Sequence, residues 1–291
     1  MTSLTPPYLL NSVSDRVKKI IIFSHEGDTH LSFVTRHLEG EEVVLINPSD
    51  LVDGTTFDFY FDGHHSEILY KDKPLGPVKS VWLRRPVPVE NRKVPVSKAV
   101  RNYARNAIQR HANMLGQAFE DALWISEPSA ILTADIKILQ LRLAARLGLN
   151  VPETLFASSG RQARAFVERR GVCIVKSQAT EHPKDRVAMT RIIKRYDALN
   201  YDALHLDPYT FQQYIEPAYE LRVTVVGDKV FTARVEGKEI DGITSKHRDW
   251  RYAHVNDTFN ARRAGLPRET AEACRRLVKG LNLEFGAIDH R

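Results

Sequence analysis

The sequence of 291 residues predicts a mixed α/β protein of the α+β kind, and three observations support this fold class. An apolar run at 18–23, a short polar stretch with a helical pattern, and a second apolar run at 42–47 indicate a strand–helix–strand opening. Apolar residues recur at helical spacing over 100–118 and predict a long helix. Strict alternation over 220–226, followed by Gly227, Asp228 and a second alternating run at 229–235, predicts a β-hairpin.

Composition narrows the class of protein further. Hydrophobic residues make up 43% of the chain and charged residues 27%, which is typical of a globular protein and argues against a disordered or collagen-like one. No apolar run reaches the ~18 residues of a membrane span, and the first 15 residues do not resemble a signal peptide. Cys173 and Cys274 are too few for a disulfide framework, so each is expected to be a small core residue. A soluble, cytoplasmic protein is the resulting prediction.

The net charge of +6, from 42 Lys and Arg against 36 Asp and Glu, is modest for this length. It favours an acidic partner through electrostatic steering. The basic residues are spread along the chain without interleaved aromatic residues, which argues against a nucleic-acid partner.

The first half of the chain contains short elements separated by turns. Residues 1–16 are expected to form a disordered tail. A loop at 24–30 precedes a helix near 32–38. Two strands, near 56–61 and 67–71, flank the turn formed by Asp62, Gly63, His64 and His65. A strand at 80–83 ends before Arg84, Arg85 and Pro86, and a proline-containing connector over 87–96 leads to the long helix.

The second half begins with a helix that follows Thr133 as a plausible N-cap and ends at Gly148. A further helix is predicted between Ser159, as its cap, and Gly171, as its stop. The remaining predicted elements are strands at 172–176, 191–196 and 210–215, the hairpin described above, a helix around Cys274 and a final strand at 284–289.

Polar residues interrupt these apolar elements at particular positions. Lys137 lies on a helix and Lys176 ends a strand; two lysines on separate elements can hold a polyphosphate. Gln213 precedes a short linker that can read adenine, Glu220 can bind ribose hydroxyls, and Asp289 at a strand end can carry Mg²⁺ that bridges phosphates. No residue of this set is specific alone, but their order along the chain indicates a nucleotide site.

These elements also carry a resemblance to a known family. The segments concerned are 81–86 (VWLRRP), 134–137 (ADIK), 151–154 (VPET), 174–176 (IVK), 211–226 (FQQYIEPAYELRVTVV), 249–251 (DWR) and 285–289 (FGAID). The second half resembles ATP-grasp ligases. From about residue 17 to the end, the chain resembles their microviridin-type branch, the graspetide synthetases that modify ribosomal peptides.

The resemblance implies a pre-ATP-grasp domain with its connecting helix at 17–125, a central subdomain at 126–215 and a C-terminal subdomain at 216–291. It implies an ATP- and Mg²⁺-dependent ligase that activates a carboxylate as an acyl phosphate, which a hydroxyl or amine then attacks to form a lactone or lactam in a precursor peptide. The residues to which it gives a role are Lys137 and Lys176 for the α- and β-phosphates, Gln213, Tyr214 and Ile215 for adenine, Glu220 for ribose, Arg222 and Arg234 for catalysis, Asp289 for Mg²⁺, and Arg84, Arg85, Asp249 and Arg251 for substrate.

The sequence departs from the family pattern after Asp289, where a Glu and an Asn that complete the Mg²⁺ site are expected. The C-terminal subdomain is therefore expected to be truncated, with one carboxylate as a weak Mg²⁺ site. Two alternatives remain open: an amino-acid ligase of the glutamate-adding type, and a non-catalytic protein that binds ATP or peptide. A homodimer is compatible with the sequence.

Other polar residues have simpler explanations. His25, Asp28 and His30 follow the first strand and are expected to be solvated or to contact substrate rather than to bind a metal ion. His64 and His65 are expected to decorate a turn. Arg84 and Arg85 can also end a strand before a proline, and Asp249 and Arg251 can also form pairs within a loop.

Overall fold

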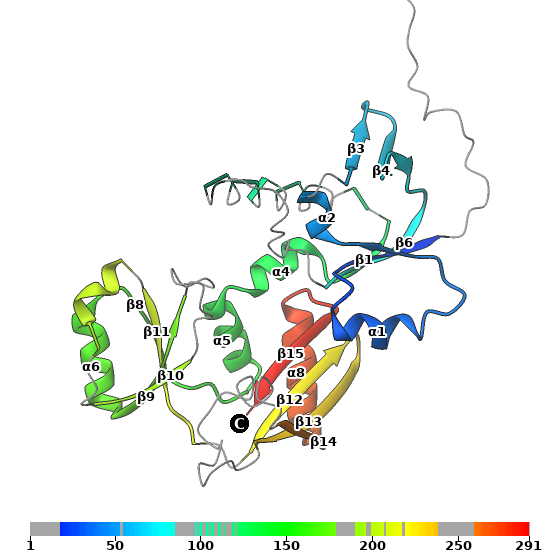
Figure 1. Ribbon diagram of the computed structural model, residues 1–291. Coiled ribbons are helices and arrows are strands. Elements are labelled where there is room, and N and C mark those ends of the chain that lie inside the picture. Colours follow the sequence, from blue (N-terminus) through cyan, green and yellow to red (C-terminus); the bar gives the residue numbers. More distant parts are fainter. Residues whose placement is uncertain are drawn as a thin grey trace, which may run out of the picture. The chain divides into compact units, whose positions relative to one another are not determined.

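A computed structural model describes the chain over 18–52, 55–84, 97, 99–100, 103–104, 106–107, 110–111, 114, 118–119, 121–178, 190–195, 199–206, 208–216, 219–237 and 259–290 (Figure 1). The chain divides into two compact units: Met1–Lys137 with Val278–Phe285, and Ile138–Leu277 with Gly286–Arg291. The expected tail at 1–16 and the connector at 87–96 lie outside the described residues.

The first unit contains a four-stranded sheet in the order β2-β1-β6-β7, in which all neighbouring strands are parallel. Its elements are β1 (Lys19–Phe23), α1 (Thr29–Thr35), β2 (Val43–Ile46), α2 (Pro48–Val52), β6 (Val78–Leu83), β7 (Leu123–Ile125) and α4 (Pro128–Ala134). β1 is a central strand, and its apolar residues are almost completely buried, as a strand covered on both faces requires. The predicted strand–helix–strand opening is confirmed.

A second sheet of the first unit has three antiparallel strands in the order β3-β4-β5. They are β3 (Phe57–Phe61), β4 (Ser66–Tyr70) and β5 (Lys73–Pro74). Phe57 is buried; its ring lies 5.9 Å from that of Phe23 and 6.0 Å from that of Tyr70. The two sheets therefore share one apolar core. The predicted turn after β3 is also confirmed, because Asp62 Oδ1 accepts hydrogen bonds from the amides of His64 and His65, which lower the pKa of this carboxyl group.

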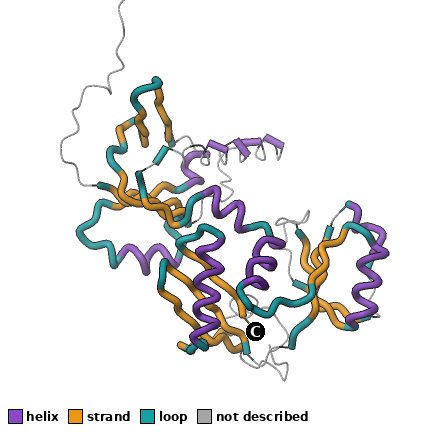
Figure 2. The backbone as a smooth tube through the Cα atoms, turned by 180° about the vertical axis from the view of Figure 1, so that it is seen from behind, coloured by secondary structure: helices purple, strands orange, loops and turns teal. Residues whose placement is uncertain are grey.

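The second unit contains an antiparallel sheet in the order β10-β9-β11-β8. Its elements are α5 (Lys137–Arg146), β8 (Thr154–Ala157), α6 (Gly160–Arg170), β9 (Val172–Ser177), β10 (Arg191–Lys194), η1 (Tyr201–His205) and β11 (Tyr209–Gln213). Helix α6 packs against this sheet, as Figures 1 and 2 both show. The Ser159 hydroxyl caps α6 through the Gln162 amide, and Gly171 ends the helix with a φ of 75°, as the sequence predicted.

A second sheet of this unit follows the order β14-β13-β12-β15. Its elements are β12 (Glu220–Val226), β13 (Lys229–Gly237), β14 (Phe259–Arg263), α8 (Arg268–Gly280) and β15 (Phe285–His290). The predicted hairpin is confirmed in its two-residue turn, where Val226 pairs with Lys229 and Gly227 has a φ of 53°. Leu221, Val223 and Val225 are buried, as their alternation predicted.

Some predicted elements differ from the structure. Thr133 does not cap a helix: it lies inside α4, and its hydroxyl bonds back to the Ser129 carbonyl oxygen at 2.9 Å. The sequence did not reveal α4 because this helix starts with Pro128 after Glu127, which makes no side-chain capping bond. Helix α1 starts at Thr29 rather than near residue 32, because Asp28 caps it through the His30 amide. The described residues of the predicted long helix are helical from Val100 to Met114, whereas Ala118 lies in a turn; Val100, Tyr103 and Met114 are exposed.

Among the described helices, none has the length and apolar character needed to cross a membrane.

Both cysteine thiols are buried, which confirms their place in the core. Burial raises the pKa of the Cys173 thiol, although the Arg170 charge opposes this shift, and burial also raises the pKa of the Cys274 thiol. The thiolate is the reactive form. We therefore expect almost no reaction with a thiol reagent at neutral pH in the native protein and reaction at both cysteines in concentrated guanidinium.

The raised pKa values also fix the direction of a pH effect on stability. The folded protein retains the thiol protons more tightly than the unfolded chain. This difference adds to the free energy of unfolding, and the added stability is fully present below the ordinary thiol pKa of about 8.5. It is lost as the pH rises above that value through the folded pKa. Rapid thiol labelling of the native protein at neutral pH would contradict the burial.

Candidate functional site

Lys176 lies near the end of a buried strand. The preceding residues of β9, Cys173, Ile174 and Val175, are buried, whereas Lys176 is exposed and pairs in register with Thr210 of β11. The apolar run fixes the strand in the core, and the flexible stem of the lysine carries its charge outward. This arrangement can hold an anionic group near the end of the strand.

The predicted adenine-reading segment continues from β11. Gln213 is anchored on both sides: its amide donates to the Glu153 carbonyl oxygen at 2.8 Å, and its Oε1 accepts from the Glu153 amide at 3.5 Å. The Tyr214 amide donates to the Val172 carbonyl oxygen at 3.4 Å. Ile215 follows with 41% of its surface exposed, so it offers an apolar contact for a planar ring.

Glu220 and Arg222 lie on the same face of β12, because side chains two residues apart share a face. Asp289 belongs to β15, which neighbours β12 in the sheet. Arg222 Nη1 donates to Asp289 Oδ1 at 2.6 Å. The structure therefore brings together three predicted residues: the carboxylate predicted for ribose, the cation predicted for phosphate and the carboxylate predicted for Mg²⁺.

Arg234 lies on the other face of this sheet. It stands opposite Leu221 in the hairpin register, whereas Glu220 stands opposite Val235 and Arg222 opposite Ala233. Directly paired residues of antiparallel strands share a face, so Arg234 shares the face of Leu221. Its guanidinium carbon is 4.5 Å from the centroid of the Tyr219 ring. The structure does not bring Arg234 together with Arg222.

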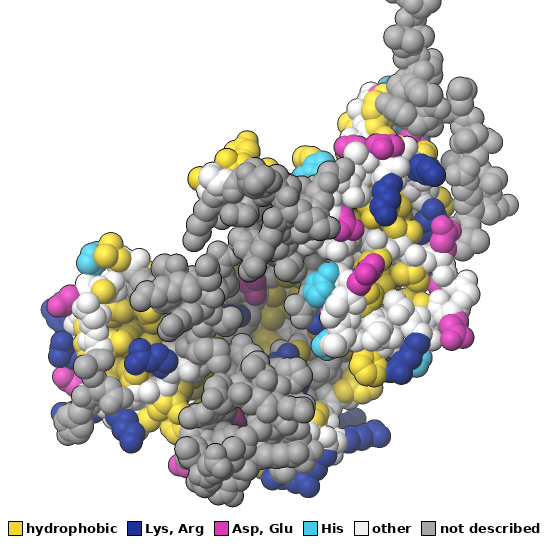
Figure 3. Space-filling model, in the orientation of Figure 1, with side chains coloured by type: hydrophobic (Ala, Val, Ile, Leu, Met, Phe, Trp, Pro, Cys, Tyr) yellow, Lys and Arg dark blue, Asp and Glu magenta, His cyan; other side chains and the backbone are white. Residues whose placement is uncertain are grey.

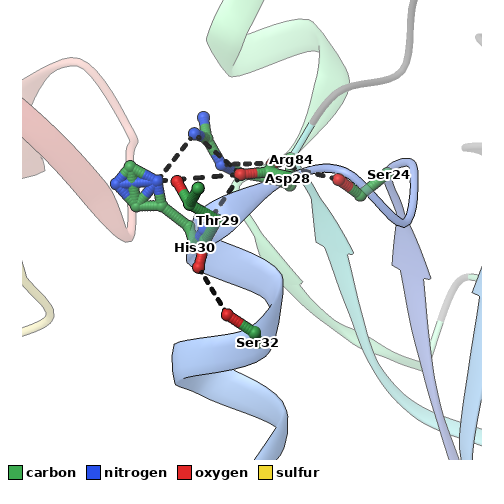
Figure 4. Close-up of polar contacts among 6 residues, drawn as sticks. All are labelled: Ser24, Asp28, Thr29, His30, Ser32 and Arg84. Atoms are coloured by element: carbon green, nitrogen blue, oxygen red, sulfur yellow. Dashed lines mark hydrogen bonds and ion pairs between the residues drawn. The ribbon is translucent and has the colours of Figure 1, made fainter.

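Arg84 belongs to a polar cluster of the first unit (Figure 4). It directly follows β6, and its Nε lies 3.1 Å from Oδ2 of Asp28, which follows β1. The Asp28 side chain is only 1% exposed and also accepts hydrogen bonds from the Ser24 hydroxyl and the His30 amide, both at 3.0 Å. Arg84 Nη2 lies 2.9 Å from His30 Nδ1. The roles of Asp28 and His30 in orienting Arg84 were not predicted.

The other predicted residues are placed as follows. Lys137 is the exposed first residue of α5. Arg85, Asp249 and Arg251 lie outside the described residues. In the part of the chain that the structure describes, no group of three or more His, Cys, Asp and Glu side chains is arranged to hold a metal ion.

Basic side chains occur at several separate places on the face drawn in Figure 3. Several basic residues pair with nearby acids: Arg275 donates to Asp228 at 2.8 Å and to Glu272 at 2.8 Å, which lowers the pKa of the Glu272 carboxyl group. Arg169 and Arg170 both pair with Glu153. These pairs explain part of the basic excess as local structure.

Comparison with solved structures identifies the fold of this chain. No protein-family model matches the chain, and no curated protein matches it. Among solved structures, macrocyclase MdnC from Microcystis aeruginosa, bound with precursor peptide MdnA, is 24% identical with a TM-score of 0.77, and the match covers 93% of this chain and 86% of MdnC. A RiPP-associated ATP-grasp ligase from Chryseobacterium gregarium, with ADP and a leader and core peptide, is 23% identical with a TM-score of 0.78, covering 94% and 84%.

A third structure is ATP-grasp ligase PsnB with a minimal precursor, Mg and ADP. It is 20% identical with a TM-score of 0.68, and the match covers 93% of this chain and 83% of PsnB. These matches extend over nearly the whole chain and include both units. The chain has the ATP-grasp fold.

Proposed function

We propose that the protein is an ATP-dependent ligase that activates a side-chain carboxylate of a ribosomal peptide. The carboxylate oxygen attacks the γ-phosphorus of ATP, which releases ADP and leaves an acyl phosphate. A hydroxyl or amine of the same peptide then attacks the acyl carbon, phosphate leaves, and the proton of the attacking group is released. The product is an internal ester or amide, and each ring removes one water from the peptide mass.

The observation that carries this proposal is the placement of Glu220, Arg222 and Asp289 on neighbouring strands of one sheet, with Arg222 bonded to Asp289. A cation and two carboxylates suit the phosphates, the ribose and a metal ion respectively. Lys176 and Lys137 supply further positive charge. Phosphoryl transfer depends mainly on positioning and on neutralising the charge of the phosphoryl oxygens, which is the contribution of lysine and arginine side chains.

The residues present fit ATP and Mg²⁺. Asp289 would hold Mg²⁺ together with phosphate oxygens, since this ion is usually bound through one or two carboxylates and substrate phosphates. The ion would supply charge neutralisation at the phosphates. The exposed position of Asp289, with 56% of its side chain accessible, leaves its second oxygen within reach of such an ion.

The fold relatives support the peptide as substrate. MdnC is seen with a precursor peptide, the C. gregarium ligase with ADP and a leader and core peptide, and PsnB with a minimal precursor, Mg and ADP. The proposal transfers this substrate class and these cofactors to the present chain. An amino-acid ligase shares the nucleotide site but would add an amino-acid mass to its product, so mass spectrometry separates the two reactions.

Lys176→Ala and Glu220→Ala test the nucleotide site. Each removes a charged partner of the bound nucleotide, so each is expected to weaken binding of the ATP analogue AMPPNP about 10- to 100-fold in calorimetry with Mg²⁺ present. The matched control is Lys194→Ala, an exposed lysine on β10 of the same sheet as Lys176, which should leave the affinity unchanged. Unchanged affinity in both test variants would refute the nucleotide site.

A further inference from the structure

The buried carboxylate of Asp28 fixes the position of the Arg84 side chain. Two contacts join them: Nε to Oδ2 at 3.1 Å and Nη2 to Oδ1 at 3.5 Å. Asp28 is itself held by the Ser24 hydroxyl and the His30 amide. A two-point contact to a buried carboxylate that is itself held by hydrogen bonds restricts rotation of the guanidinium.

This cluster lies where the strand order of the parallel sheet changes direction. The chain passes from β1 to β2 on one side and later returns to β6 on the other side of β1. Asp28 follows β1, and Arg84 follows β6, so both lie beyond the carboxyl ends of adjacent parallel strands. In open α/β sheets this position is where ligands bind. The topology is thus a second, independent reason to expect a ligand here.

The hydrogen-bonding roles within the cluster follow from the chemistry of arginine. A guanidinium group can only donate, so His30 Nδ1, 2.9 Å from Arg84 Nη2, is the acceptor and the ring proton lies on Nε2. Among the described residues, the contacts of Arg84 use Nε and Nη2 and leave Nη1 for another acceptor. The cluster therefore retains two donors, Arg84 Nη1 and His30 Nε2.

The charge of the cluster is arranged with its negative side inward. The Asp28 side chain is 1% exposed, that of Arg84 26% and that of His30 65%. A ligand approaching from the solvent therefore meets N–H donors before it meets the carboxylate. Among the described residues, the cluster offers one guanidinium group, that of Arg84, so this site suits a singly charged carboxylate better than a phosphate, which requires several cations.

We propose that Arg84 Nη1 and His30 Nε2 form a binding site for a side-chain carboxylate of the peptide substrate, with Asp28 as the positioning residue. The identification of the carboxylate as part of a peptide substrate rests on the proposed function. The binding site itself requires no nucleotide. Its test can therefore fail or succeed independently of the ATP site.

The experiment uses two capped synthetic peptides, one containing Glu and Asp and its counterpart containing Gln and Asn. Calorimetry on the full chain without nucleotide should show tighter binding of the acidic peptide. His30→Ala and Arg84→Lys should each reduce this preference about tenfold, because each removes one charge-assisted or oriented donor. Asp28→Asn should reduce it by a similar factor through the orientation of Arg84, while binding of the amide peptide stays unchanged.

Arg36→Lys and His37→Ala are the matched controls, since both residues lie at the exposed end of α1. They should preserve the preference for the acidic peptide. His30 is exposed, so His30→Ala tests the site even where Asp28→Asn does not fold. Equal binding of the two peptides by the native protein would overturn the proposal.

A separate titration with AMPPNP shows whether the cluster binds a peptide carboxylate or a nucleotide phosphate. The proposal expects the nucleotide affinity to be unchanged in His30→Ala and Arg84→Lys. A loss of nucleotide affinity in these variants, with unchanged peptide preference, would assign the cluster to phosphate and overturn the carboxylate site. Failure of the native protein to bind AMPPNP, with the peptide preference intact, would refute the proposed ligase and leave this site standing.

Discussion

Phe211→Ala is expected to lower the free energy of unfolding by about 3–5 kcal/mol. Phe211 is completely buried on β11, between β9 and β8 in the sheet of the second unit. Its ring belongs to a core with Val167, Cys173 and Val175. Truncation removes the ring's transfer free energy and leaves a cavity that the backbone of two paired neighbouring strands prevents from closing.

Urea denaturation followed by circular dichroism measures this loss as a lower midpoint with an unchanged slope. Phe231→Ala is the matched control, because Phe231 lies on β13 with 55% of its surface exposed and should change stability by less than about 0.5 kcal/mol. Equal losses in the two variants would show that Phe211 does not form part of the core. Retention of the native midpoint by Phe211→Ala would have the same meaning.

Local signals predicted the local elements of this fold. The Gly227–Asp228 turn fixed the pairing of β12 with β13 because a two-residue turn permits one register. The Ser159 cap and Gly171 stop likewise defined α6 within the chain itself. The order β10-β9-β11-β8 was not predicted, because β8 is a four-residue strand whose pairing with β11 depends on residues far away in sequence.

In the candidate site, too, contacts between residues close in sequence could be predicted and contacts between distant residues could not. The shared face of Glu220 and Arg222 follows from the alternation of side chains along a strand. The two-residue turn sets the register of the hairpin, and this register places Arg234 on the opposite face. The contact of Arg84 with Asp28 joins residues 56 positions apart. Periodicity indicates where each loop begins but not which loops meet. The available signal was that Arg84 directly follows one apolar strand and Asp28 lies in the loop after another, and parallel pairing brings the carboxyl ends of such strands to one edge.

Gly160→Ala is expected to destabilise the protein by about 3 kcal/mol, at the upper end of the usual cost of overpacking. Gly160 is the first residue of α6, and a Cβ atom there would lie 2.4 Å from the Tyr201 carbonyl oxygen and 2.9 Å from its carbon. Both are backbone atoms, so no side-chain rotation relieves the clash. Tyr201 begins η1 and is buried in the same core as Phe211, which resists a compensating shift.

The sign of this effect makes the experiment decisive. In a helix without such a contact, replacing glycine by alanine stabilises by about 0.4–1 kcal/mol, because alanine loses less conformational entropy on folding. Gly265→Ala is the matched control, since a Cβ at Gly265 meets no atom within 4 Å. Its effect on the unfolding midpoint should be neutral or slightly stabilising. A stabilised Gly160→Ala protein would show that α6 does not approach the Tyr201 backbone this closely.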